Sequence, residues 1–470
     1  MLFNSLQFLV FFPAVVLLYW ILPDRWRNPM LLAASYYFYM SWEPVYALLI
    51  LISSVTTWGC GMLMFRDHDR RKLWLVLCLV LNLGILFTYK YLGFAAQSLH
   101  DAMTAAGIAM HVPEFTLLLP VGISFYTFQA VGYTIDVYRG DLKPERSLLT
   151  YCLFVAFFPQ LVAGPIERAK NLLPQFHDVH RFNGYNLLEG IKMMVWGFFM
   201  KLCIAESVAP YVNAVYNNIE MHNGVSIWLA TFFFTFQIFC DFGGYSLIAI
   251  GTARCVGFTL MQNFRQPYLA RDVKDFWRRW HISLSSWFSD YVYIPLGGSR
   301  CSTTRHQRNL FVTFLVSGLW HGANWTFVAW GAYHGALQVA LSLKRKFIPW
   351  KFPLQRVGVV IGVVVTFVLS MFGWVLFRAN SLADAKIAFS RMLHPHGMLF
   401  NGDGKPDIAL PLLLIMLLML HELRNECGTR RMAFTSHPNV YVSAGWTAVL
   451  IVIILLCAKF QGGQFIYFQF

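Results

Sequence analysis

Apolar residues occur in this chain as long runs that are separated by short polar stretches. The runs have about the length of one bilayer-spanning helix, roughly 20 residues, and they lack the ~10-residue alternation of a membrane β-barrel. The pattern therefore predicts an all-α polytopic membrane protein. The predicted apolar segments lie near 5–22, 29–40, 44–65, 73–96, 115–138, 148–166, 186–208, 226–252, 309–342, 355–378, 407–422 and 440–458.

Two of these segments predict something other than a plain span. The 309–342 segment is long enough for a hairpin of two helices, or for one tilted helix with a re-entrant piece. In the 148–166 segment, Pro159 and Pro165 bracket Gly164, and broken backbone at membrane depth is tolerated only inside protein or beside water. We therefore expect about eleven transmembrane helices with additional re-entrant and interfacial helices, in a single integral domain over 1–470.

The composition agrees with a membrane protein. Hydrophobic residues make up 57% of the 470 residues and charged residues 13%, about half of the roughly 25% that soluble domains carry. The mean hydropathy is +0.52. Lys and Arg (37) exceed Asp and Glu (23), but the basic residues fall in short loops between apolar runs. Topology-setting loops explain this excess, and we expect no nucleic-acid partner.

Loop charge also predicts the orientation of the spans. Clusters of Lys and Arg mark one set of loops as cytoplasmic, whereas 97–114 and 209–225 contain neither residue and are assigned to the other side. This assignment places both termini on the extracytoplasmic side, provided that 148–181 enters the membrane and returns. The nine cysteines form no CxxC pair and lie mostly in apolar runs, which indicates small buried side chains and no metal site.

A histidine in the 311–335 stretch is the first candidate for chemistry. His321 lies in FVTFLVSGLWHGANWTFVAWGAYHG, among small residues such as Gly318 and Gly322. An ionisable side chain at bilayer depth is costly, so it indicates a functional site by default. The glycines would let another backbone or a ligand come close.

A second histidine lies in the basic segment 262–308. Within 275–298, aromatic residues and His281 recur at 3-and-4 spacing, which predicts one apolar helical face on an interfacial helix, with Arg278 and Arg279 opposite. His281 is either a satisfied core residue or a second functional histidine. The basic residues could hold an anionic donor such as the phosphates of coenzyme A, or they could contact lipid headgroups.

Three further residues are supporting candidates. Asp241, which shares a helical face with Gln237, needs a partner at this depth, either as a structural ion pair or to orient an imidazole. Asn324 lies three residues after His321. Tyr467 belongs to the aromatic tail GGQFIYFQF, which could plug a groove or swing the Tyr467 hydroxyl into a cavity.

These stretches together resemble one family. The matching sequences are LPVGISFYTFQAVGYTIDVYRG, FPQLVAGPIER, QIFCDFGGYSLIAIGTARCVGF, NFRQPYLARDVKDFWRRWHISLSSWFSDYVYIPLGGSR, SGLWHGANWTFVAWGAYHG and the terminal FIYFQF. In this order the chain resembles the membrane-bound O-acyltransferase (MBOAT) family, in its bacterial alginate O-acetylation branch. The resemblance implies a funnel of membrane helices with the family's histidine at its floor. It places the invariant histidine at His321 and the second at His281, and suggests an acyl relay through Tyr467.

The resemblance and the residues together predict a function. We expect a membrane O-acetyltransferase of the bacterial inner membrane that passes an acyl group, acetyl above all, from a cytoplasmic thioester such as acetyl-CoA to a hydroxyl of an exported polysaccharide such as alginate. We expect no bound cofactor. The expected partners are membrane lipid, the acyl donor, a periplasmic or membrane acetyltransferase and a polysaccharide synthesis complex.

The expected chemistry centres on His321. A neutral imidazole, whose ordinary pKa is ~6.5, suits a general base on the acceptor hydroxyl, and a covalent acyl-imidazole is the variant. His281, Asn324 or Asp241 would orient the ring or polarise the carbonyl. The alternative is a transporter of an acylated or lipid-linked intermediate, with the histidines relaying protons. Transporters often contain inverted repeats, and the sequence shows no such internal symmetry.

Overall fold

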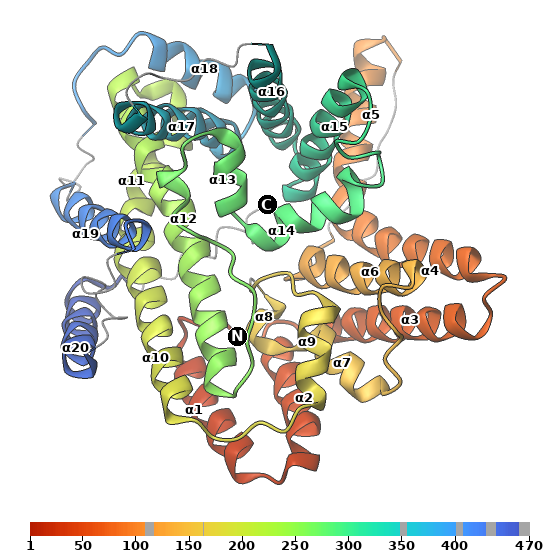
Figure 1. Ribbon diagram of the computed structural model, residues 1–470. Helices are drawn as coiled ribbons and strands as arrows, with labels where there is room; N and C mark the ends of the chain where they lie inside the picture. Colours follow the sequence, from red (N-terminus) through yellow and green to blue (C-terminus); the bar gives the residue numbers. More distant parts are fainter. Residues whose placement is uncertain (109–116, 163, 348–354, 401–407, 429–438, 460–470) are drawn as a thin grey trace. The chain divides into compact units, whose positions relative to one another are not determined.

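Every secondary-structure element in the described residues is helical (Figure 1), as the apolar runs predict. The structure is a computed structural model that describes residues 1–108, 117–162, 164–347, 355–400, 408–428 and 439–459. The chain forms two compact units. One consists of Met1–Gly190 with Thr252–Met261, and the other of Ile191–Gly251 with Gln262–Phe470. The expectation of a single integral domain stays a prediction.

The first unit contains the N-terminal helices. Within it, α3, α4 and α6 pack against one another, and α2 packs against α7. Its elements are α1 (Leu6–Ile21), α2 (Asp24–Met40), η1 (Pro44–Tyr46), α3 (Ala47–Arg66), α4 (Arg71–Leu86), η2 (Phe87–Tyr91), α5 (Leu92–Ala105), α6 (Ile123–Arg139), α7 (Leu148–Ala156), α8 (Phe158–Leu161), α9 (Ala169–His177) and the start of α10 (Gly184–Phe198).

The second unit contains both candidate histidines. Its residues share a core of buried aromatic and aliphatic side chains. Its elements are η3 (Phe199–Ala205), α11 (Glu206–Tyr216), η4 (Ile219–Met221), α12 (Gly224–Cys255, of which the last turn belongs to the first unit), η5 (Pro267–Leu269), α13 (Val273–Arg279), α14 (Ile282–Phe288), η6 (Ser289–Tyr293), α15 (Thr303–His321), α16 (Trp325–Phe347), α17 (Gln355–Arg378), α18 (Leu382–Leu393), α19 (Ala409–Glu426) and α20 (Val440–Cys457).

Four helical stretches in the described residues are long and apolar enough to cross a membrane. They are Pro44–Arg66, Arg71–Ala105, Gly224–Cys255 and Val357–Arg378, with shorter apolar helices at Leu6–Ile21 and Tyr441–Cys457. The count of about eleven is not confirmed, because several predicted spans form interrupted helices. The 148–166 segment, for example, divides into α7 and α8. This division confirms the break expected around Pro159, and its re-entrant path stays a prediction.

The prediction of one continuous helix over 275–298 is wrong. The segment forms two seven-residue helices, α13 and α14, followed by the π-helical turn η6. His281, at the junction, has a left-handed backbone with φ of 42°. The cause is pairing with a distant segment: the Arg265 N–H donates to the Arg279 carbonyl, and the Ile282 N–H donates to the Asn263 carbonyl, both at 2.9 Å. His281 is nevertheless buried, as its spacing predicted.

The 309–342 segment forms the two-helix hairpin that was one of its two predicted structures. Helices α15 and α16 pack backbone to backbone, because glycines lie where they meet. A Cβ added to Gly331 would lie 2.5 Å from the Phe314 carbonyl oxygen, and one added to Gly318 would overlap the Phe327 carbonyl. Small residues at such positions let membrane helices approach closely. His321 thus ends α15 instead of lying in the middle of a span.

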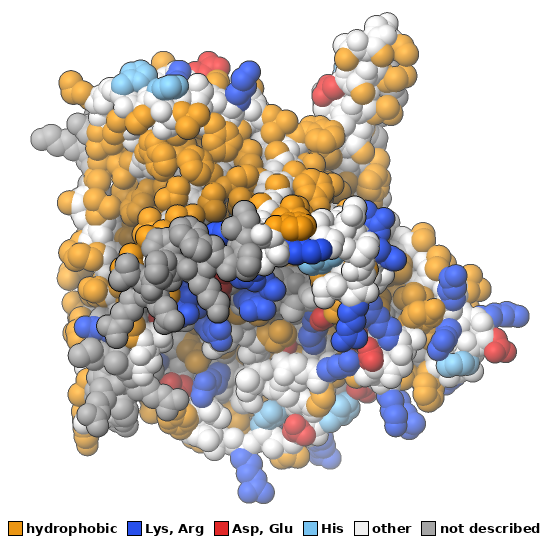
Figure 2. Space-filling model, turned by 45° about the horizontal axis from the view of Figure 1, so that its top comes forward, with side chains coloured by type: hydrophobic (Ala, Val, Ile, Leu, Met, Phe, Trp, Pro, Cys, Tyr) orange, Lys and Arg blue, Asp and Glu red, His pale blue; other side chains and the backbone are white. Residues whose placement is uncertain are grey.

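Large areas of the surface are apolar. Figure 2 shows hydrophobic side chains covering broad regions of the visible face. On α17, Val360 is 63% exposed and Val364 56%, and on α20 Leu456 is 80% exposed. A contiguous apolar surface of this extent needs an apolar environment that shields it from water. A lipid environment supplies it, in agreement with the predicted membrane protein.

We predict that Gly318→Ala destabilises the protein by about 1–3 kcal/mol, because the added methyl group overpacks the α15–α16 contact. The check is the thermal unfolding temperature of the detergent-solubilised protein. Gly445→Ala on α20 is the matched control, since a Cβ there meets no atom within 4 Å. Equal unfolding temperatures for the two variants would contradict the packing argument.

Candidate active site

His321 lies in an aromatic enclosure at the turn of the hairpin. Its side chain is 4% exposed. The ring centroid lies 5.0 Å from that of Trp320, 4.9 Å from that of Trp330 and 5.4 Å from that of Phe377. Gly322 permits this enclosure, because a Cβ there would overlap the Phe327 ring. The sequence therefore buries an ionisable ring among aromatic side chains and keeps the adjoining backbone small.

His281 also lies near the Trp320 ring. The His281 and Trp320 ring centroids are 6.2 Å apart, and the His281 and Phe242 centroids are 4.6 Å apart in a T-shaped arrangement. Its Nδ1 lies 3.3 Å from Oδ1 of Asn263. Burial lowers the pKa of His281 to about 3, so this ring is neutral at physiological pH. The structure thus brings the two candidate histidines to one region, with an indole beside both.

A cavity of about 480 Å³ lies in the second unit, and neither His281 nor His321 is among the residues that line it. Its wall includes Ser317, which lies four residues before His321 on α15 and so shares a helical face with it. The wall also includes Ser285, whose N–H donates to the His281 carbonyl at 2.9 Å. One end of the cavity therefore lies about one helical turn from each histidine.

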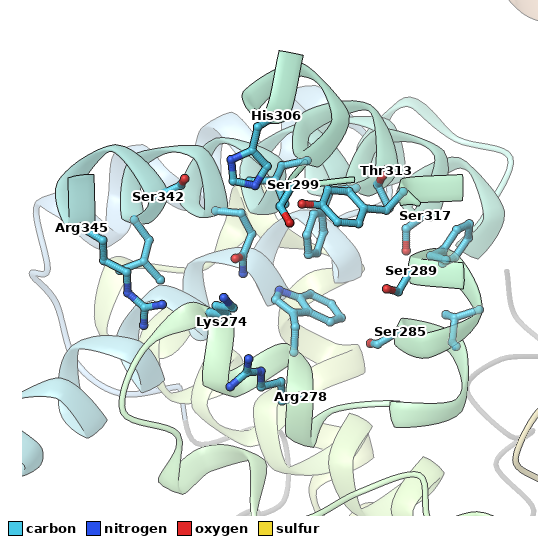
Figure 3. Close-up of a pocket in the computed structure, with 18 residues that line it drawn as sticks. Lys274, Arg278, Ser285, Ser289, Ser299, His306, Thr313, Ser317, Ser342 and Arg345 are labelled. Carbon is cyan, nitrogen blue, oxygen red and sulfur yellow. The ribbon is translucent and has the colours of Figure 1, made fainter. Parts of the chain in front are cut away.

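The two sides of the cavity differ in chemistry. Figure 3 shows cationic side chains toward one side of the cavity, and three serine hydroxyls on the opposite side. The cations are Lys274, Arg278 and Arg345, and the hydroxyls are those of Ser285, Ser289 and Ser317. Apolar side chains such as Trp277 and Phe314 line the cavity as well. This arrangement fits a long ligand with an anionic head and a small reactive end.

The structure separates Arg278 from Arg279, which were predicted to act together. Arg278 is exposed and lines the cavity. Arg279 is 6% exposed and forms a bidentate pair with Glu426, at 2.7 and 3.0 Å, and a further bond to Asp275 at 3.0 Å. The hydrogen bonds that Arg279 donates to Glu426 raise the pKa of Arg279. Arg279 therefore ties α13 to α19, and only Arg278 remains a candidate for donor binding.

Asp241 takes the first of its two predicted roles, the buried ion pair. The Lys201 ammonium lies 2.5 Å from an oxygen of Asp241 and 2.7 Å from an oxygen of Glu206. All three side chains are less than 9% exposed. This triad connects α12 to η3 and α11, and breaking such a group leaves an uncompensated charge in an apolar environment.

The other two supporting candidates have different outcomes. The Asn324 side-chain oxygen accepts from the Thr326 N–H at 3.0 Å, which caps the start of α16, and its amide donates to the Asn380 carbonyl at 3.2 Å. These bonds fix the hairpin turn that carries His321. Tyr467 lies outside the described residues, so its relay role stays a prediction.

Several residues of the site were missed from the sequence. Arg345 was not predicted, whereas Lys274 belongs to the basic segment that was expected to hold an anionic donor. The two lie 71 residues apart in the chain, on α16 and α13, and only the fold brings them to one cavity. Lys201 carried a partial signal, because it is one of two lysines within the apolar 186–208 run. Asn263 carried none, since an asparagine in a polar segment is unremarkable before its buried partners are known.

An apolar helical chain with buried histidines beside a cation-lined cavity has the features of a membrane enzyme that uses an anionic activated donor. The chain belongs to the MBOAT, or membrane-bound O-acyltransferase, family, whose model matches residues 145–379. It is therefore an acyltransferase. The matched region contains His281, His321 and nearly all of the second unit up to α17.

Named relatives support this assignment. The chain is 41% identical over 400 residues to the probable alginate O-acetylase AlgI of Azotobacter vinelandii, covering 83% of this chain and 78% of the relative. It is 32% identical over 436 residues to the peptidoglycan O-acetyltransferase of Helicobacter pylori, covering 85% and 81%. It is 28% identical over 282 residues to the teichoic acid D-alanyltransferase of Bacillus subtilis, covering 57% and 71%.

We predict that Lys201→Met costs about 3–5 kcal/mol of stability, because Asp241 and Glu206 lose their buried ammonium partner. The check is the yield and unfolding temperature of the solubilised protein. Asp241→Asn should be milder, since the Lys201–Glu206 pair remains, and it should keep acyl-transfer activity. A Lys201→Met protein as stable as the parent would show that the triad contributes nothing.

Proposed function

We propose that this chain is a membrane O-acetyltransferase of the bacterial inner membrane. It takes an acetyl group from acetyl-CoA, or from another acyl thioester reaching it from the cytoplasm, and moves it across the membrane to a hydroxyl acceptor, for O-acetylation of an exported polysaccharide such as alginate. The observation that carries the proposal is the cavity with cations on one side and an opposite end one turn from His321. The relatives, an alginate O-acetylase, a peptidoglycan O-acetyltransferase and a teichoic acid D-alanyltransferase, agree with it.

The donor would lie along the length of the cavity. Its phosphates would meet Lys274, Arg278 and Arg345, since guanidinium and ammonium groups form strong charge-assisted hydrogen bonds with phosphate. Arg345 already bonds Asp272 at 2.7 Å, which holds its side chain in place at the cavity edge. The thioester arm would pass along the apolar wall that Trp277 and Phe314 form, and reach the hydroxyls.

His321 would then act as the general base. Its imidazole takes the proton of the acceptor hydroxyl while that oxygen attacks the thioester carbonyl carbon. The carbon–sulfur bond breaks, and the proton passes from the imidazolium to the departing thiolate. The enclosure by Trp320, Trp330 and Phe377 supports this role, because a water-poor site limits hydrolysis of the thioester.

The wider assembly follows from the same proposal. The acceptor would approach from the extracytoplasmic side through the family's funnel, with both termini on that side. A periplasmic or membrane acetyltransferase partner, working with the polysaccharide synthesis complex, would complete the transfer to the sugar. Tyr467 would be placed to relay the acyl group, by resemblance alone.

We predict that His321→Ala lowers acetyl transfer by about 10²- to 10⁴-fold, the usual contribution of general acid–base catalysis, while the protein remains folded. The check is mass analysis of acceptor acetylation by purified protein in detergent, with His396→Ala as control because His396 is exposed and bonded to its own segment. Full activity of His321→Ala would exclude the base role. Turnover only in sealed vesicles with a gradient would indicate the transporter instead.

We predict that Lys274→Gln combined with Arg278→Gln raises the KM for acetyl-CoA by roughly tenfold or more with little change in kcat, because each cation contributes to holding the phosphates. Steady-state kinetics at fixed ionic strength measure this. Lys386→Gln, which removes an exposed cation of α18 outside the cavity, is the matched control. An unchanged KM in the double variant would place the donor elsewhere.

A further inference from the structure

Asn263 is the centre of a buried hydrogen-bond network beside His281. Its side chain is 1% exposed, and its partners His281, Ser283 and Ser246 are each at most 1% exposed. The amide nitrogen donates to Ser246 Oγ at 2.9 Å. The amide oxygen accepts from Ser283 Oγ at 2.6 Å and lies 3.3 Å from His281 Nδ1. The network joins α12, the segment after it and α14.

The backbone holds Asn263 and His281 together as well. The Ile282 N–H donates to the Asn263 carbonyl at 2.9 Å, and the Arg265 N–H donates to the Arg279 carbonyl at the same distance. These bonds stabilise the left-handed conformation of His281, which is costly for a residue other than glycine. Such conformations persist where the surroundings over-determine them, and they cluster at functional sites.

The amide orientation determines which ring nitrogen carries the proton. Because Asn263 offers its carbonyl oxygen, His281 must donate from Nδ1–H. A neutral imidazole has one N–H, so Nε2 then carries a lone pair and accepts hydrogen bonds. The partner of one ring nitrogen commonly fixes the role of the other in this way.

We propose that Asn263 is a positioning residue for acyl transfer, which holds His281 as a neutral ring with Nδ1 protonated and Nε2 as an acceptor. This inference rests on the proposed function. The sequence left two roles open for His281, either to orient the reacting imidazole or to polarise the thioester carbonyl, and this inference decides between them. A ring with a lone pair on Nε2 cannot donate to the thioester carbonyl, so His281 orients a donor group, either the acceptor hydroxyl or an N–H of His321.

The charges around His281 leave it neutral. On the elements packed against it, the charged and titratable side chains of the adjoining turns are Asp241, His321, Arg265 and Arg279. Asp241 is paired with Lys201, Arg279 is paired with carboxylates, and Arg265 is exposed. Burial lowers the pKa of His281. An uncharged amide at Nδ1 preserves this state, whereas a carboxylate there would favour the imidazolium.

The test compares kcat of the purified full-length protein with Asn263→Asp and Asn263→Ala across the neutral pH range. The probes are acetyl-CoA and an alginate oligosaccharide, with release of free thiol as readout. In Asn263→Asp the carboxylate raises the His281 pKa. Protonation at Nε2 then removes the acceptor as pH falls, so the ratio of variant to parent kcat should fall by about tenfold per pH unit below the new pKa. Asn82→Asp, a buried amide of the first unit, is the matched control and should keep a flat ratio.

Asn263→Ala gives an independent result. The ring loses its anchor, so kcat should fall by roughly 10- to 100-fold while the KM for acetyl-CoA stays unchanged. A flat ratio for Asn263→Asp, or a rise in KM matching the loss of kcat in Asn263→Ala, would overturn the inference. If Asn263→Asp is not recovered folded, Asn263→Ala decides alone. The proposed function fails separately, if the parent protein shows no turnover or does not depend on His321.

Discussion

The backbone contact between α15 and α16 is the constraint on which the candidate site depends. Where Gly318 meets Gly331, the helices approach more closely than any side chain would allow. That approach forces the sharp turn after His321 and places Trp330 of α16 against the imidazole. Interiors packed at crystal-like density transmit small displacements, so a methyl group at the contact would shift the ring. The position of His321 is thus determined by two glycines, Gly318 and Gly331, which carry no side chain.

Buried polar groups then join the segments around the hairpin. In a lipid environment, apolar side chains give helices little reason to prefer one another over lipid tails, and packing and polar bonds become more important. Arg279 ties α13 to α19, and Lys201 ties η3 to α12. Asn263 ties the segment after α12 to α14. The contacts of Arg279 and Asn263 fix α13 and α14, which carry part of the cavity wall.

Much of the fold could be predicted from the sequence, because length and apolarity determine helices in a membrane protein. The hairpin, the break near Pro159 and the burial of both histidines were accessible in this way. The break at His281 was not, because it arises from backbone pairing with Asn263, 18 residues earlier in the chain. The separation of Arg278 from Arg279 was equally hidden, since a one-residue step around α13 turns one side chain to the cavity and the other to Glu426.

The partner of Asp241 shows the same limit in electrostatic terms. A buried carboxylate requires a counter-charge, and this requirement follows from the sequence alone. Which cation supplies it depends on the packing of α12 against η3, which no local pattern encodes. The need for a buried cation was therefore predictable from the sequence, whereas its identity as Lys201 was not.

The central claim is that a thioester donor spans the cavity from its cations to His321. The most direct test is an experimental structure with a non-hydrolysable thioether analogue of acetyl-CoA. We expect the phosphates beside Lys274 and Arg278, and the acetyl carbon within about 4 Å of the imidazole. An analogue bound in the opposite direction, or outside this cavity, would contradict it.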